Sequence, residues 1–360
     1  MAKIGMPEIK IVFESQGLSA IQRSERGIVL LLLKGETENE QGSYKFSTIL
    51  DMKETIQFSK KNAELIRLAF EGTPNKMLIE VVGEKNPLDV VLKKYELVKF
   101  NYYAAPNLEA EDVKKVMGWH DKVAINSDKT IKFVGFNLVN ANHETIINWS
   151  TSAITYDGTE YTGQEFTALV ASQLAGLPLN RSLTYFKWPK ISEASLDFID
   201  NQDAAVDQGK LFLTYDGENY KVARAVNSLT DGGDKKGDDF KKIKIVEAMH
   251  LIKDDIRDTF DKYYVGKVPN TYDNKQQFIA MINRVYFAEL KGSVLENNDR
   301  NKVDININAN LKYAIERGAE VDYMTTQQIK EFNTGSKVFL EGNVSLIDAM
   351  EDLYINFWNE

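Results

Sequence analysis

Two stretches at opposite ends of the chain alternate apolar residues with other side chains, as extended strands do. The first covers residues 8–14 and the second covers residues 353–358. The residues that share an apolar face are Ile9, Ile11 and Phe13 in the first stretch and Leu353, Ile355 and Phe357 in the second. A strand of this kind needs a sheet to join. Each terminus therefore either lies at the edge of its own chain's sheet or adds to the sheet of a neighbouring molecule, and the pattern leaves both arrangements open.

Between the termini, short apolar runs alternate with stretches of helical spacing. Residues 28–33 are apolar throughout, which is typical of a strand buried on both faces, and the polar stretch 34–45 predicts a loop. Further strands are expected at 76–82, 100–106 and 130–136, and helices at 63–70, 88–97, 109–120 and 166–174. Strands that alternate with helices of about ten residues predict a central α/β layer with a largely parallel sheet.

The second half of the chain has a different pattern. Residues 211–215 and 220–225 flank an Asp216-Gly217 pair, which favours a hairpin. A polar, glycine-rich loop at 231–239 precedes a long amphipathic helix that runs from Ile245 to Phe260. A second helix is expected at 272–291, and strands at 303–308, 338–344 and 353–358. These elements predict a C-terminal α+β domain.

The fold class is therefore mixed α/β and α+β. We expect an extended N-terminal arm, a β-rich α/β domain, a central α/β domain and a C-terminal α+β domain that ends in a second arm. The corresponding ranges are 1–24, 25–88, 89–237 and 238–360, with 345–360 as the C-terminal arm.

The composition of the chain excludes several classes of function. The 360 residues carry a formal net charge of -9, which argues against a surface that binds phosphates over its whole extent. Cysteine is absent, so disulfides, thiol nucleophiles and cysteine zinc sites are excluded, as expected for maturation in a reducing cytoplasm. The N-terminus lacks a signal-peptide pattern, and residues 28–33 are too few to span a membrane. We expect a soluble protein that is assembled inside the cell, without membrane insertion or direct nucleic-acid binding.

The sequence lacks the common motifs for catalysis, phosphate binding and metal binding. The three histidines, His120, His143 and His250, show no metal-ligand spacing, and neither a phosphate-binding glycine loop nor a Gly-x-Ser-x-Gly elbow occurs. We therefore assign no catalytic, cofactor-binding or metal-binding residue. An α/β enzyme remains the alternative, and its site is expected at the carboxyl ends of the central strands, near 104–107 and 137–143.

Several short motifs occur in a recognisable order. They are Ser24-Glu-Arg-Gly27, Tyr102-Tyr-Ala-Ala-Pro106, Ala175-Gly-Leu-Pro-Leu-Asn-Arg-Ser-Leu-Thr-Tyr185, Ala225-Val-Asn-Ser-Leu-Thr230, Ile252-Lys-Asp-Asp-Ile-Arg257, Tyr264-Val-Gly-Lys-Val-Pro-Asn270 and Gly342 followed by Asp348-Ala-Met-Glu351. Together they resemble the tail sheath proteins of contractile phage tails, particularly the compact type in Gram-positive myophages, defective prophages and R-type bacteriocins. The resemblance covers essentially the whole chain.

The resemblance implies a structural subunit without enzymatic activity. Such a subunit polymerises helically around an inner tube and contracts to drive the tube through a cell envelope. The terminal arms would add to the C-terminal sheet of neighbouring subunits, and the accepting strand would carry Val338, Leu340 and Val344. One charged face of the long helix is a candidate for contacts that exchange on contraction, although an ordinary solvated face is the alternative. Its residues are Lys253, Asp254, Arg257 and Asp258.

The resemblance also implies partners and a location. The partners are other copies of the chain, the inner tail tube protein, which the C-terminal domain would contact, and the baseplate and tail terminator proteins. The location is the tail of a virion or bacteriocin particle assembled in the host cytoplasm. The sheath of a cellular contractile injection system remains a further alternative, because the two kinds of machine share the fold.

Overall fold

The computed structural model describes residues 26–52 and 58–358. Its described residues form two units. Residues 26–251 and 348–358 form one, called here the central unit, and residues 252–347 form the C-terminal unit. The expected N-terminal arm strand at 8–14, with Ile9, Ile11 and Phe13, lies outside the described residues.

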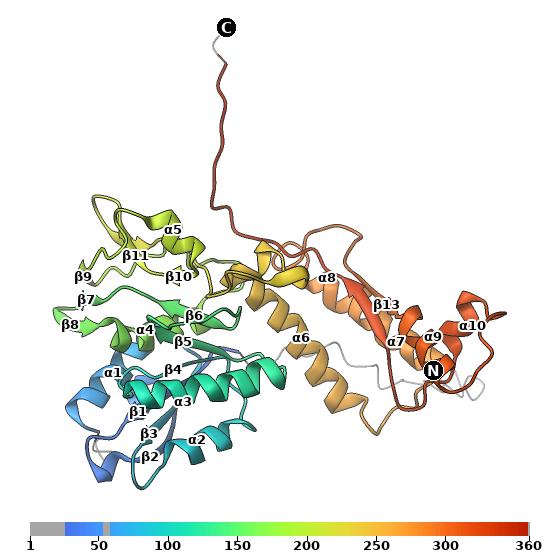
Figure 1. The fold of residues 1–360 in the computed structure, drawn as a ribbon, viewed down its shortest axis with the longest axis horizontal. Coiled ribbons are helices and arrows are strands. Elements are labelled where there is room, and N and C mark those ends of the chain that lie inside the picture. The colour runs from blue at the N-terminus through green and yellow to red at the C-terminus, as the bar shows by residue number, and fades with distance from the viewer. Residues whose placement is uncertain (1–25, 53–57, 359–360) are drawn as a thin grey trace, which may run out of the picture. The chain divides into compact units, whose positions relative to one another are not determined.

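A seven-stranded sheet forms the middle of the central unit (Figure 1). Its strands in chain order are β1 Ile28–Lys34, β2 Gly42–Phe46, β3 Lys76–Val82, β4 Tyr102–Ala104, β5 Lys132–Phe136, β6 Ile146–Trp149 and β10 Lys210–Leu211. The spatial order is β10-β6-β5-β4-β1-β3-β2, and every neighbouring pair is parallel except β2 with β3. The predicted central α/β layer with a largely parallel sheet is confirmed.

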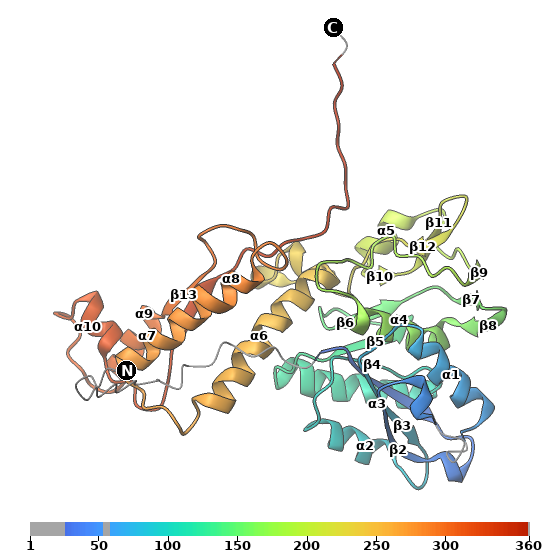
Figure 2. The ribbon, with the colours of Figure 1, turned by 180° about the vertical axis from the view of Figure 1, so that it is seen from behind.

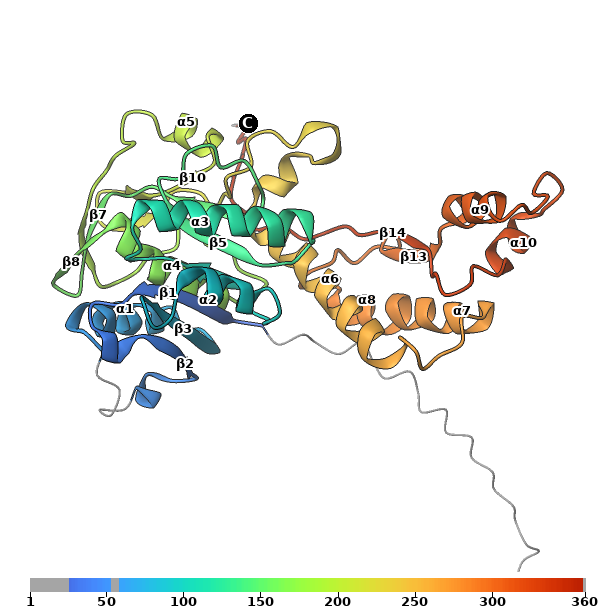
Figure 3. The same ribbon diagram turned by 60° about the horizontal axis from the view of Figure 1, so that its bottom comes forward.

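Helices cover both faces of this sheet. They are α1 Lys60–Phe70, α2 Leu88–Tyr95, α3 Ala110–His120, α4 Gly163–Gly176 and the short α5 Gln202–Asp207. In Figure 3, α2 and α3 lie in front of the strands and α4 lies behind them. The strand β1 shows why both layers are needed: Leu31 packs with residues of α1 and α4, whereas Leu30 packs with residues of α2 and α3. The uninterrupted apolar run of β1 therefore contributes to two hydrophobic cores, one on each face of the sheet.

Smaller sheets complete the central unit. One contains β7 Ala153–Tyr156, β8 Thr159–Thr162 and β9 Ile191–Ala194, and the other contains β11 Leu213–Tyr215 and β12 Tyr220–Val222. The hairpin predicted around Asp216 is confirmed, since the Asp216 carboxylate accepts from the backbone N–H groups of Glu218 and Asn219, and Gly217 takes a φ of 97°.

The C-terminal unit is helical with one small sheet. The long helix α6, Ile243–Tyr263, belongs to the central unit up to Leu251 and to the C-terminal unit from Ile252. The remaining elements are α7 Tyr272–Met281, the π-helical turn η6 Ile282–Tyr286, α8 Phe287–Leu290, β13 Lys302–Ile305, α9 Ile307–Glu316, α10 Thr326–Glu331 and β14 Leu340–Asn343. Helices α7 and α8 follow one another beside β13 (Figure 2). The predicted α+β character of this part is confirmed.

Three expectations need correction. The stretch 34–45 is not only a loop, because β2 begins at Gly42 and pairs with β3. The expected domain boundary at residues 88/89 falls inside one sheet, since β1 pairs with both β3 and β4, so 25–88 and 89–237 share one unit. Residues 353–358 have no regular secondary structure, because a strand needs a partner and none of the described residues pairs with them.

Candidate assembly surfaces

The C-terminal segment 353–358 exposes its large side chains to solvent. The exposed fraction is 82 % for Leu353, 92 % for Tyr354, 57 % for Ile355, 89 % for Phe357 and 88 % for Trp358. Single exposed apolar residues are common on folded proteins, but a run of five within six positions marks an interaction site. The residues that were predicted to share one face of an arm are therefore available to a partner.

The segment just before this run is held firmly. Asp348 forms an ion pair with Lys242, and Asp352 lies 2.5 Å from a guanidinium nitrogen of Arg224. The Glu351 carboxylate accepts a hydrogen bond of 3.0 Å from the Ser182 hydroxyl, and it lies 3.6 Å from Arg224 Nε. Glu351, Ser182 and Arg224 all belong to the central unit. Hydrogen bonding to Asp348 raises the pKa of Lys242. We call Asp348, Glu351 and Asp352 the arm root; its ion pairs were not foreseen from the sequence.

The expected acceptor strand is present in shortened form. β14 pairs antiparallel with β13, and Leu340 lies opposite Ile305, which is buried. Val338 precedes the strand and Val344 follows it, so only Leu340 of the three expected acceptor residues lies within β14. Gly342 permits the close approach of the two strands, since a Cβ there would lie 2.7 Å from the Lys302 carbonyl oxygen.

The loop before β14 is positioned by Asn270. Its side-chain amide donates to the carbonyl oxygens of Gly335 and Lys337, at 2.8 and 2.9 Å. Lys275 of α7 donates to the hydroxyl of Thr334, at 3.1 Å. These contacts connect the strand to the turn between α6 and α7, which contains the Tyr264–Asn270 motif noted in the sequence.

The four candidate lattice residues lie on α6 in the C-terminal unit. Arg257 is exposed, whereas Lys253, Asp254 and Asp258 are half-buried. Between them, the fully buried Asp255 accepts a hydrogen bond of 2.7 Å from the Tyr286 hydroxyl. The adjacent Asp254 and Asp255 thus differ in environment, a distinction that apolar spacing alone did not reveal.

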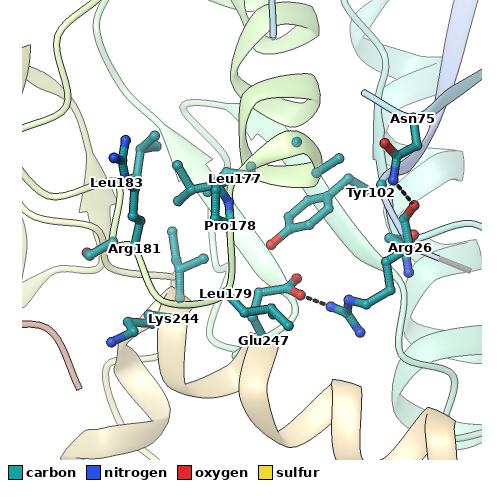
Figure 4. Close-up of a pocket in the computed structure, with 17 residues that line it drawn as sticks. Arg26, Asn75, Tyr102, Leu177, Pro178, Leu179, Arg181, Leu183, Lys244 and Glu247 are labelled. Carbon is teal, nitrogen blue, oxygen red and sulfur yellow. Dashed lines mark hydrogen bonds and ion pairs between the residues drawn. The ribbon is translucent and has the colours of Figure 1, made fainter. Parts of the chain in front are cut away.

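A second charged cluster lies at the amino ends of the central strands, around a cavity of about 300 Å³ (Figure 4). Glu247 of α6 pairs with Arg26, which directly precedes β1, and with Lys132 of β5. Burial opposes the charge on Glu247, but Lys132 and Arg26 outweigh that effect and lower its pKa to about 2. Lys132 Nζ also lies 4.6 Å from the centre of the Tyr102 ring. The sequence places Arg26 in a short motif, but it did not predict that Arg26 and Lys132 pair with Glu247.

At the opposite edge of the sheet, where an α/β enzyme would place its site, groups near 104–107 are hydrogen-bonded to other parts of the chain. The Gln164 side-chain amide donates to the carbonyl oxygens of Ala105 and Leu108, at 3.2 and 2.7 Å. Asn107 donates to the side chain of Asn62 and accepts from the backbone N–H of Lys34. The carboxyl-edge groups near 104–107 are thus engaged in holding the chain together.

Near 137–143 the structure joins two histidines that lie far apart in sequence. The backbone N–H of Thr145 donates to His143 Nδ1 at 3.2 Å, and the Thr145 hydroxyl oxygen lies 2.7 Å from the same nitrogen. The same hydroxyl oxygen lies 2.8 Å from His120 Nε2, and the Tyr103 hydroxyl lies 2.9 Å from His120 Nδ1. His143 Nε2 lies 3.3 Å from Glu144. Burial lowers the pKa of both His120 and His143, which favours their neutral forms.

Among the described residues, no group of three or more histidine, aspartate or glutamate side chains is arranged to hold a metal ion. The helices of the same part of the chain include none that is long and apolar enough to cross a membrane.

The known proteins that this chain resembles in sequence and in fold are of one kind. Residues 235–358 match the family described as the phage tail sheath C-terminal domain. A tail sheath protein of Clostridium phage phiCD119 is 34 % identical over 362 aligned positions, covering 98 % of each chain. Among solved structures, a sheath tail protein of Desulfitobacterium hafniense has 18 % identity and a TM-score of 0.68, covering 82 % of this chain and 93 % of its own. The contracted helical sheath of the anti-feeding prophage has 13 % identity and a TM-score of 0.71, covering 99 % of both chains.

Proposed function

The chain belongs to the tail sheath proteins, the structural subunits of contractile sheaths, and on this premise we propose that it assembles with its own copies by exchanging terminal arms. The C-terminal arm would be residues 353–358, and a segment near 8–14 would serve as the N-terminal arm. The receiving element would be β14 of a neighbouring subunit, where Leu340 lies on the apolar side of the sheet. Backbone hydrogen bonds would provide the adhesion, and alternate apolar side chains would set the register.

The exposed C-terminal segment is the observation that carries this proposal. It combines strand-forming residues, high exposure and no strand partner among the described residues, and it begins directly after the fixed arm root. Within the described residues the receiving sheet has only two strands, and a two-stranded sheet is marginally stable without further cover. Exchange between neighbouring subunits would give the exposed segment a strand partner and would add a third strand to the receiving sheet.

Contraction would then be a change between two lattices of the same subunits. The arms would keep neighbours attached while each subunit rotates as a body, and the energy would be stored during assembly. Lys253, Asp254, Arg257 and Asp258 remain candidates for contacts that differ between the two lattices. No step of this mechanism requires a catalytic residue, and the family consists of structural proteins.

The partners follow from the same role. We propose an inner tube protein inside the sheath and baseplate and terminator proteins at its two ends, in the tail of a phage or bacteriocin particle assembled in the host cytoplasm. A sheath for a cellular injection system is equally compatible with the fold, because similar structures include the sheath of an extracellular contractile injection system, with 12 % identity and a TM-score of 0.69.

The test compares three forms of the protein by negative-stain electron microscopy: the full chain, a form that ends at residue 352 and a form that lacks residues 1–17. We expect tubes or stacked rings from the full chain and only small particles from the two shortened forms. Each form is also unfolded thermally, and the form ending at residue 352 should keep the melting temperature of the full chain. Tubes of unchanged length and number from both shortened forms would refute arm exchange.

A further inference from the structure

A cavity of about 480 Å³ lies in the C-terminal unit, beside the turn that joins α6 to α7. Its walls are largely aromatic. The centre of the Tyr264 ring lies 4.5 Å from that of Phe278 and 5.7 Å from that of Phe260, and all three residues line the cavity. The volume is in the range found for ligand pockets. The motif at 264–270 noted in the sequence therefore forms one side of a cavity large enough to bind a ligand or a partner's side chains.

A lysine is buried in the wall of this cavity without a carboxylate partner. Lys275 is 5 % exposed, and its one hydrogen bond among the described residues goes to the Thr334 hydroxyl, at 3.1 Å. Burial lowers the pKa of Lys275, and no acidic neighbour offsets that effect. A buried cation costs stability unless it is paired, and for this reason buried lysines normally lie beside carboxylates. The described part of the chain does not supply one here.

Two further polar groups in the same wall lack a partner. The Tyr264 hydroxyl and Oδ1 of Asn270 are buried, and neither forms a hydrogen bond with the described residues. Burial raises the pKa of Tyr264 to about 12, so its hydroxyl stays protonated at neutral pH and can donate. The amide nitrogen of Asn270, by contrast, already donates to the carbonyl oxygens of Gly335 and Lys337. The cavity thus presents a cation and an O–H donor to an anion, and an amide oxygen to an N–H group.

We propose that this cavity binds an acidic segment of a different protein, in which a carboxylate stands next to an aromatic or large aliphatic residue. The carboxylate accepts hydrogen bonds from Lys275 and Tyr264, and the positive charge of the lysine makes its bond a strong one. The neighbouring apolar side chain packs against Phe260 and Phe278. A backbone N–H of the same segment donates to Oδ1 of Asn270. Each unpartnered group in the wall then has a partner of the matching kind.

The exposed C-terminal segment of a second copy lacks the required charge. None of residues 353–358 is acidic, and the preceding Glu351 and Asp352 lie beside Arg224 in the central unit. The groups that line the cavity also lie within residues 260–338 of one chain. The inference therefore does not depend on arm exchange.

The test uses N-acetyl-L-phenylalanine, which combines a carboxylate, an N–H and an aromatic ring, and its uncharged amide as the control probe. Binding to the full chain is measured by ligand-observed NMR titration, at protein concentrations too low for polymerisation. We expect the acid to bind more tightly than the amide by about tenfold or more, because a hydrogen bond to a charged group is worth more than one between neutral groups. Equal binding of the two probes, or binding of neither, would overturn the proposal.

A pair of lysine variants assigns the preference to one side chain. Lys275→Met keeps the apolar stem and should remove the preference for the acid, whereas Lys267→Met, at an exposed lysine of the same turn, should retain it. Since Lys275 is buried without a countercharge, Lys275→Met should keep or raise the melting temperature of the single chain. A clear fall in melting temperature would mean that Lys275 serves the stability of the single chain, and would count against a docking role.

Tubes formed from this chain alone distinguish a different protein from a second copy as the occupant. If a different protein fills the cavity, such tubes should bind the acid as tightly as the unassembled chain does. A loss of binding of about tenfold or more on polymerisation would assign the cavity to a second copy and overturn the proposal. A chain that prefers the acid but forms no tubes would count against arm exchange and leave this inference standing.

Discussion

Lys132 Nζ lies 2.5 Å from Glu247 Oε1, which joins the start of β5 to α6 through a pair of side chains that are 1 % and 13 % exposed. Arg26 contacts the other oxygen of the same carboxylate. Glu247 thus ties together the residue that precedes β1, the central sheet and the helix that leads into the C-terminal unit.

Replacement of Glu247 by Gln should destabilise the subunit strongly. It leaves Lys132 buried without its countercharge, and removal of one member of a buried pair costs about 3 to 5 kcal/mol. Urea unfolding of the unassembled subunit at pH 7 measures this. The control is Glu111→Gln, which removes an exposed pair with Lys114 and should change the free energy of unfolding by less than about 1 kcal/mol. Equal effects of the two substitutions would contradict a special role for Glu247.

The same carboxylate predicts acid sensitivity. The pKa of Glu247 is lowered from 4.5 to about 2 in the folded protein, so its stabilisation is present above pH 4.5 and is lost as the pH falls toward 2. A single group contributes a slope of about 1.4 kcal/mol per pH unit across this window. Glu247→Gln should remove that share of the slope when unfolding is measured between pH 5 and pH 2.5, and an unchanged slope would argue against the assignment.

The chain of Tyr103, His120, Thr145 and His143 predicts a second pH effect at higher pH. Burial, aided by His143, lowers the pKa of His120 from 6.5 to about 3, so stability should fall as the pH drops from 6.5 toward 3. His120→Gln should reduce this dependence. Thr145→Val keeps both histidines but breaks the chain, so it should lower stability at pH 7 by about 1 to 3 kcal/mol while a pH slope persists. Urea unfolding at pH 7, 6, 5 and 4 distinguishes the two outcomes.

Arm exchange predicts that the two faces of the C-terminal segment differ in importance. Ile355→Lys places a charge on the apolar face, whereas the neighbouring Asn356→Lys places it on the other. Both positions are exposed in the single chain, so neither change should shift the melting temperature by more than about 1 °C. Ile355→Lys should abolish sedimentable polymer, and Asn356→Lys should largely preserve it. Equal loss from both would contradict a strand with one buried face.

The arm root predicts a charge-swap result. Lys242→Asp or Asp348→Lys alone should raise the protein concentration needed for polymerisation about tenfold or more, because a loosely held arm loses more conformational entropy on binding. The double substitution restores opposite charges and should recover most of the loss. Pelleting assays over a concentration series provide the measurement, and a double variant as defective as the singles would refute the electrostatic anchor.

Local pattern determined much of this protein. The apolar run of β1 and the boundaries of β3 follow from the local sequence pattern, because a strand buried on both faces is rich in apolar residues. The hairpin at Asp216-Gly217 follows from turn chemistry, and the alternation of Leu353, Ile355 and Phe357 predicted the segment that we propose as an arm. Each of these features depends on residues that are close together in sequence.

Only the tertiary structure decided which distant residues meet. β2 was missed because only Tyr44 and Phe46 of its five residues are apolar, and its pairing with β3 joins segments more than thirty positions apart in the sequence. The Glu247 cluster and the arm root join residues that are 106 to 221 positions apart. No periodicity records such pairs, because charged side chains find their partners only after packing has brought their elements together. The sequence identified a segment suited to strand addition, and the structure showed that the large side chains of this segment are exposed.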